Sequence, residues 1–242
     1  MLFDSDLQPA APRLISTPWG ELRPSVDLLP VLYLLVLYGV VFFLPFDLFE
    51  AWRKGEDGPA EWLQFLGYAG AALAAFAVAW QRRRVFPALP CLAWLVLAVL
   101  CVLIAGEEIS WAERLTGAGV DAIRRINDQG ETTIHNIPLF QQFMHFGFIA
   151  VGLLLGYFGW RFWPRIDAFP ARRFSLYFLP VALFYTYWDL SWITRGERIR
   201  NDQEAIELML AAGLFLHAWT MARRQRRLRA VGLPASDPLP RP

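Results

Sequence analysis

The chain has 242 residues, a formal net charge of +1 and a hydrophobic content of 56%. This composition is too apolar for an ordinary soluble domain and is typical of a chain dissolved in lipid, and the near-zero net charge argues against a nucleic-acid partner. The only two cysteines, Cys91 and Cys101, lie about 15 Å apart on one predicted helix, which excludes a disulfide between them.

Six apolar segments have about the 20 residues that a helix needs to cross a bilayer core. They are residues 27–46, 62–80, 85–106, 142–160, 174–194 and 203–222. The fifth carries Asp189 and the sixth begins with Glu204 and Glu207, which indicates that both border a polar cavity. The predicted fold class is an all-α polytopic membrane bundle of about six helices, with short interfacial helices on the external side.

Charge is distributed unevenly between the two ends of these spans. Arginines concentrate on the side of the N-terminus, above all in Arg82–Arg84 and Arg223–Arg229, and acidic residues concentrate on the opposite side. By the positive-inside rule, both termini are predicted to be cytoplasmic. The predicted organisation is an N-terminal segment 1–26, a membrane domain 27–222 and a basic, then Pro-rich tail 223–242.

Small residues recur every four positions in two of the spans. This spacing places them on one helix face, where they let a neighbouring helix approach closely, so it predicts a compact bundle. The positions are Gly67, Ala71, Ala75 and Ala79 in the second span and Gly152 and Gly156 in the fourth.

A polar segment, Gly106-Glu107-Glu108-Ile109-Ser110-Trp111, directly follows the third span. Two adjacent carboxylates at the end of a span are costly unless they are hydrated, paired or metal-bound, so Glu107 and Glu108 are candidate catalytic residues. The spacing of Ile109, Trp111 and Leu115 favours an interfacial helix that continues the span. The alternative interpretation is a capped, salt-bridged helix end.

Further along the same external segment, Glu131 and His135 are four residues apart. On a helix they would share one face, which suits a divalent metal ion or an acid–base pair, and both are candidate catalytic residues. His145 would complete a metal site with them. The alternative is a hydrogen-bonded polar cluster. His217 lies mid-way along the sixth span and is interpreted as a core or cavity histidine.

Two external segments resemble each other. An acid–apolar–Ser–Trp–x–x–Arg pattern occupies 108–114 and 189–195, Asn–Asp–Gln recurs at 127–129 and 201–203, and a fainter copy begins at Asp47. The pattern predicts three helical hairpins that are parallel repeats about an axis normal to the membrane, with chance similarity as the alternative. The candidate binding residues are Trp111, Asn127, Gln129, Asn136, Asp189, Trp192 and Glu204.

The motif Gly106–Trp111, followed by Gln129-Gly130-Glu131 and His135-Asn136, resembles a group of uncharacterised bacterial multi-pass inner-membrane proteins. In that group Gly-Gln follows the tryptophan, whereas Ala112-Glu113 stands here. The resemblance implies a bacterial inner-membrane setting and carries no activity with it.

Three kinds of function fit these residues. The first is an external site that binds or processes a lipid head group or a lipid-linked substrate, with membrane lipid as the partner. The second is a structural or accessory subunit whose external charges are ion-paired and whose loops hold a second copy or a partner membrane protein. The third is a small transporter in which Asp189, Glu204, Glu207 and His217 line a path.

Overall fold

The computed structural model describes residues 15–17, 20–22, 26–43, 58–83, 88–127, 130–135, 137–189 and 203–230. A short hairpin, in which β1 (Ile15–Thr17) pairs antiparallel with β2 (Gly20–Leu22), precedes the helices. The rest of the described chain is helical or connects helices, which confirms the predicted all-α class.

Six principal helices of the described residues form the bundle. They are α1 (Leu29–Phe43), α3 (Pro59–Arg82), α4 (Ala88–Glu108), α7 (Pro138–Leu153), α9 (Ser175–Asp189) and α10 (Gln203–Ala230). The α7 helix continues through a π-helical turn, η2 (Leu154–Phe158), into α8 (Gly159–Phe162). Four of the described helices are long and apolar enough to cross a membrane: α3, α4, the continuous α7–α8 helix and α10. The α1 and α9 helices coincide with predicted spans but have 15 residues each.

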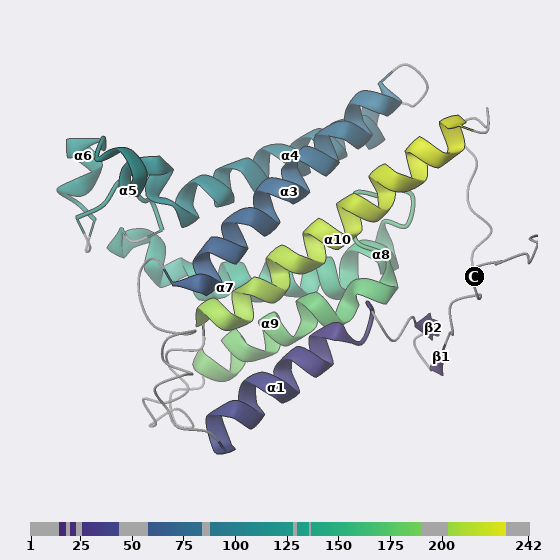
Figure 1. The fold of residues 1–242 in the computed structure, drawn as a ribbon, viewed down its shortest axis with the longest axis horizontal. Helices are drawn as coiled ribbons and strands as arrows, with labels where there is room; N and C mark the ends of the chain where they lie inside the picture. Colours follow the sequence, from purple (N-terminus) through teal and green to yellow (C-terminus); the bar gives the residue numbers. More distant parts are fainter. Residues whose placement is uncertain are drawn as a thin grey trace, which may run out of the picture.

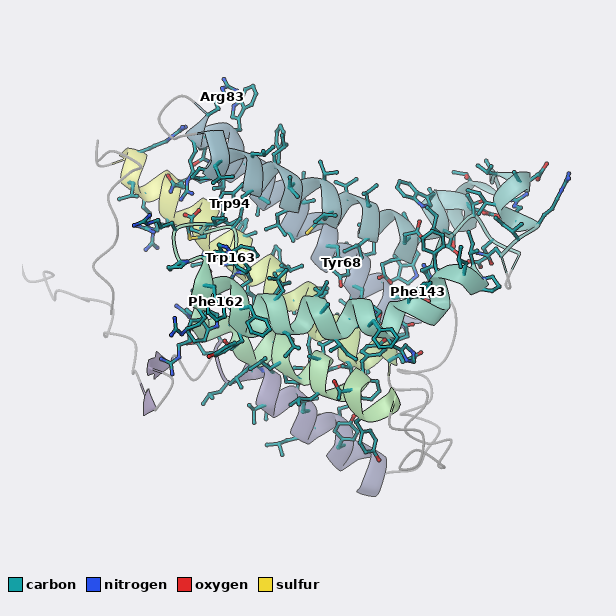
Figure 2. The ribbon with its side chains drawn as sticks, turned by 180° about the vertical axis from the view of Figure 1, so that it is seen from behind. Tyr68, Arg83, Trp94, Phe143, Phe162 and Trp163 are labelled. Carbon is teal, nitrogen blue, oxygen red and sulfur yellow. The ribbon has the colours of Figure 1, made fainter. Side chains whose placement is uncertain are left out.

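Consecutive helices run in opposite directions, so their starts and ends alternate between the two ends of the bundle (Figure 1). One end is rich in acidic residues and the other in arginine. The acidic end holds the end of α4 and the starts of α3, α7 and α10, with Glu61, Glu107, Glu108, Glu204 and Glu207. The opposite, basic end holds the end of α3, α8, the start of α9 and the end of α10, and Figure 2 shows Arg83 there. The α10 helix also continues beyond the predicted span and carries the Arg223–Arg229 cluster on its last turns.

Small residues bring the central helices together, as their spacing predicts. A Cβ added at Gly67 of α3 would lie 3.0 Å from the Ala211 Cβ of α10. A Cβ at Gly152 of α7 would lie 2.9 Å from the Phe178 carbonyl oxygen of α9. Neither position has room for a side chain without movement of its neighbour.

A polar cluster at the basic end joins α3, α4 and α10 to the connection that follows α8. Asp167, in the connection after α8, accepts hydrogen bonds of 2.7 Å from Arg82 and 2.9 Å from the Trp94 indole nitrogen. His217 is 3% exposed, stacks on Trp94 and lies 3.1 Å from the Asp167 carbonyl oxygen. His217 is therefore a core histidine. A second ion pair, Asp27 with Arg173 at 2.7 Å, ties the start of α1 to the start of α9.

Candidate functional site

The chain breaks sharply after α4. Ser110, Trp111 and Ala112 have φ values of 49°, 54° and 66°, a left-handed conformation that costs about 1 kcal/mol or more for each non-glycine residue. Three short helices follow: η1 (Ser110–Ala112), α5 (Glu113–Thr116) and α6 (Asp121–Arg124). The segment after the third span is therefore not one interfacial helix that continues the span, because the helical backbone breaks at these residues. Residues 109–135 form what we call the cap.

Glu107 is the central acceptor of the cap. One carboxylate oxygen accepts a 2.6 Å hydrogen bond from the Trp111 indole nitrogen. The other accepts from the backbone nitrogens of Ile134 and His135, at 2.6 and 3.1 Å, and lies 3.2 Å from the His135 Nδ1. Gly106 makes room for this arrangement, since a Cβ there would lie 2.9 Å from the Trp111 ring. Glu107 thus connects the end of α4 to the last residues of the cap through hydrogen bonds.

Hydrogen bonds also join the remaining motif residues to each other. Ser110 donates a 2.7 Å hydrogen bond to Glu131, and the Asn127 amide donates to the Thr133 carbonyl oxygen at 2.7 Å. The segment 130–135 is not helical, so Glu131 and His135 do not share a helix face. The expectation that their spacing pairs them is wrong, because each side chain bonds to a different partner.

Glu113 links two other segments of the cap through hydrogen bonds. It accepts a 2.7 Å hydrogen bond from the Thr132 backbone nitrogen and a 2.6 Å hydrogen bond from the Arg124 Nε. Hydrogen bonds from Thr132, reinforced by Arg124, hold the pKa of Glu113 below its ordinary value. Glu113 therefore has a structural role in the cap.

We expect the cap to loosen in acid. Because folding lowers the pKa of Glu113, its contribution to stability is complete above the ordinary glutamate pKa of about 4.3 and is lost as the pH falls through the lower pKa of the folded state. Hydrogen exchange of residues 113–133, corrected for the intrinsic rate, measures this loss. Glu113→Gln should show a weaker acid dependence, and an equal dependence in both proteins would contradict the assignment.

Beneath the cap, at the acidic end, lies a cavity of about 690 Å³, which we call the acidic cavity. Its polar lining consists of Glu61, Tyr68, Glu107, Glu108, His135, His145, Tyr185, Gln203, Glu204 and Glu207. Its apolar lining consists of Ile104, Met144, Gly147, Phe148, Val151 and Leu210. Of the described residues, no lysine or arginine lines it.

Helical periodicity explains why these side chains meet. Residues three, four or seven positions apart share a helix face. Glu204 and Glu207 are three apart on α10, Ile104 and Glu108 are four apart on α4, and Glu61 and Tyr68 are seven apart on α3. The α7 helix contributes Met144, Phe148 and Val151 by the same rule. Each helix thus turns one face of its acidic end toward the cavity.

The inner wall of the cavity is held by buried polar contacts. The Tyr185 hydroxyl donates to a Glu207 carboxylate oxygen, and the Gln64 amide donates to the Glu204 side chain at 2.8 Å. The Tyr185 ring stacks on Phe148 at 4.5 Å and lies 5.1 Å from His145. These contacts fix the directions of the two α10 carboxylates from both sides.

The structure brings together five of the residues singled out from the sequence. Glu107, Glu108, His135, His145 and Glu204 all line the acidic cavity. Glu131, Trp111 and Asn127 belong to the cap and do not line it.

Several other sequence predictions concern residues that the structure does not describe. Gln129, Asn136 and Trp192 lie outside the described residues, and Asp189 is the last residue of α9. The three-hairpin repeat also remains a prediction, because most of its second and third copies falls in the undescribed stretches 44–57 and 190–202.

A metal ion is not favoured by the described geometry. Within the described part of the chain, no three His, Cys, Asp or Glu side chains are arranged to hold one. The predicted set separates because Glu131 bonds to Ser110, His135 lies against Glu107, and the ring of His145 packs on Tyr185.

Sequence reasoning left five polar lining residues out of the candidate site: Glu61, Tyr68, Tyr185, Gln203 and Glu207. Glu207 is three residues from Glu204 on the same helix, so spacing alone pointed to it. Tyr68 and Tyr185 lie within apolar spans, and from sequence alone a tyrosine in such a span is interpreted as a residue of the hydrophobic core. Only their contacts with residues of other helices identify them.

The cavity does not continue as a polar path to the basic end. Below it α10 presents Leu210, Ala211 and Leu214 to the core, and His217 belongs to the separate cluster around Asp167. Along the described helices the polar residues of the two ends are therefore divided by an apolar layer, which does not favour the transporter hypothesis.

The membrane-length helices and the cavity at one end of their bundle define a class, a multi-helix membrane protein with a polar pocket at one end. None of the protein-family models, curated proteins or solved structures compared with the chain matches it. The site is therefore interpreted from its own chemistry.

Proposed function

We propose that this chain is a multi-pass protein of the bacterial inner membrane that binds the head group of a membrane lipid in the acidic cavity. In this proposal α1 and α9 span with the four longer helices, the basic end faces the cytoplasm with both termini, and the cavity faces the external leaflet. The concentration of arginine at the basic end supports this orientation through the positive-inside rule.

The observation that carries the proposal is the composition of the cavity wall. Five glutamates line it beside six apolar or small residues, and a pocket with both kinds of lining suits an amphipathic ligand. An anionic head group such as phosphoglycerol would be repelled by the carboxylates, whereas an ammonium group would be attracted. The ligand class that fits best is a lipid with an ammonium-bearing head group.

The same wall holds groups that can transfer protons. Imidazoles and carboxylates act as general acids and bases when they reach the ligand. Glu107 is committed to the cap, so processing of a bound lipid would fall to Glu108 and His135. The proposed catalytic pair is therefore narrower than the four candidates taken from the sequence.

The structural hypothesis is supported by a separate observation. The motif residues Glu107, Ser110 and Glu131 take part in hydrogen bonds that hold the cap, as do Glu113 and Asn127. These contacts explain the motif without any ligand, but they do not explain Glu61, Glu204 or Glu207, which lie in the cavity. We therefore assign the structural role to the cap and the binding role to the cavity.

Binding of defined lipids tests the proposal. Native mass spectrometry of the purified full chain should show phosphatidylethanolamine bound in preference to phosphatidylglycerol. The double variant Glu204→Gln/Glu207→Gln should lower that preference by about tenfold or more, because two carboxyl groups that line the cavity around the ammonium group are lost. Asp121→Asn is the matched control, since Asp121 lies at the same end, has a side chain 78% exposed and does not line the cavity. Equal binding of both lipids by the wild type would refute the proposal.

A further inference from the structure

The acidic cavity is bordered on one side by two helices that barely touch each other. Ile104 and Glu108 of α4 and Met144, Gly147 and Val151 of α7 all line it. The α4 helix packs on α3, and α7 packs on α9, while direct contact between α4 and α7 is slight. In Figure 2 the α7 helix, which carries Phe143, comes near α4 at the acidic end and diverges from it toward the basic end. The wall of the cavity between α4 and α7 is therefore held by few direct contacts between helices.

The outer surface beside this wall is apolar. Leu100 and Leu103 on α4 and Phe143 and Phe146 on α7 are all exposed large hydrophobic side chains. Both helices belong to continuous segments of membrane length, so these side chains would lie against lipid. Gly147 is exposed too, and a Cβ built on it meets no atom within 4 Å. Apolar groups thus occupy both the lipid-facing surface and the adjoining wall of the cavity.

The size of the cavity also bears on its occupant. Its volume lies in the range of about 300–1,000 Å³ that holds one small molecule, which suits a head group but not a lipid with two long chains. A lipid whose head group lies among the carboxylates must therefore keep its chains outside, and the apolar side between α4 and α7 is where they can lie.

We propose that the acidic cavity opens sideways to the external leaflet between α4 and α7 and takes a phospholipid directly from the bilayer. The ammonium-bearing head group lies near Glu108, Glu204 and Glu207, and an acyl chain lies along Met144 and Val151. This inference rests on the proposed function and adds to it the route and the source of the ligand, a lipid dissolved in the membrane.

A blocking substitution tests the route. The full chain is placed in lipid nanodiscs with phosphatidylethanolamine that carries a photoreactive diazirine in one acyl chain, and the labelled residues are mapped by mass spectrometry. Wild-type protein should be labelled on α4 and α7 around Ile104 and Val151. Gly147→Trp fills the gap and should reduce this labelling by about tenfold. Gly39→Trp is the matched control, because Gly39 of α1 is also a helical glycine with no atom within 4 Å of its added Cβ and does not line the cavity.

A water-soluble probe separates the two proposals. Glycerophosphoethanolamine has the same head group without chains, and its binding to Gly147→Trp should remain. Unchanged lipid labelling in Gly147→Trp would overturn the lateral route, while the proposed function would stand if Glu204→Gln/Glu207→Gln lowered the preference for phosphatidylethanolamine as expected above. Wild-type protein that binds the soluble probe but is not labelled by the lipid would also overturn the route. Failure to bind either probe would overturn both proposals. If Gly147→Trp does not fold, Val151→Trp, at a lining position that is 37% exposed, gives the same test.

Discussion

Replacing Glu107 by alanine is expected to release the cap, whereas Glu108→Ala should leave the cap in place and weaken lipid binding. The Glu107 side chain is 17% exposed and accepts hydrogen bonds from Trp111 and from two backbone nitrogens. Loss of hydrogen bonds to a mostly buried carboxylate costs about 2–3 kcal/mol, and the donors left behind must find water. Exchange of the Ile134 and His135 amides should therefore accelerate strongly in Glu107→Ala.

The neighbouring position supplies the control for this experiment. Glu108 lines the acidic cavity, so Glu108→Ala should lower the affinity for phosphatidylethanolamine while cap exchange stays near that of the wild type. Glu107→Gln should be intermediate, because its amide oxygen can still accept from Ile134 but its amide nitrogen cannot accept from Trp111. Equal cap exchange in Glu107→Ala and Glu108→Ala would refute the division of roles between the two carboxylates.

Asp167→Ala is expected to destabilise the bundle by about 3–5 kcal/mol, because it leaves the charge of Arg82 buried without its carboxylate. The Arg82 side chain is 3% exposed, and Asp167 also accepts from the Trp94 indole nitrogen. The same substitution frees the connection between α8 and α9 from the end of α3. Thermal or denaturant unfolding of the protein in detergent measures the loss.

Two further variants show whether the lost ion pair is responsible. Arg165→Ala changes an exposed residue of the same connection and should shift stability by less than about 0.5 kcal/mol. Arg82→Leu/Asp167→Leu removes both charges and should be more stable than Asp167→Ala, since no unpaired charge remains buried. A double variant as unstable as Asp167→Ala would contradict this explanation.

The properties that depend on local composition and spacing could be predicted from the sequence. Apolar segments of membrane length predicted α3, α4, the helix from Phe143 to Phe162, and α10. Small residues every four positions predicted the close contacts of Gly67 and Gly152. These features repeat along one helix, so no knowledge of its neighbours is needed.

The described parts of α1 and α9 coincide with two predicted spans, and both end where the described residues end. The break in the helical backbone after α4 was not predicted. Ser110, Trp111 and Ala112 are not residues that favour a left-handed backbone, and hydrogen bonds from Ser110 to Glu131 and from Trp111 to Glu107 accompany this conformation.

The opposite roles of Glu107 and Glu108 were decided by tertiary structure alone. The two carboxylates are adjacent in the sequence at the end of a span, and the sequence alone makes both of them candidates for the same chemical role. On the helix they point about 100° apart; both line the cavity, and Glu107 in addition accepts a hydrogen bond from the Ile134 backbone nitrogen of the cap. Apolar helices and an acidic end follow from the sequence, but a cavity forms only where several helices converge, and that convergence depends on contacts between residues far apart in the chain.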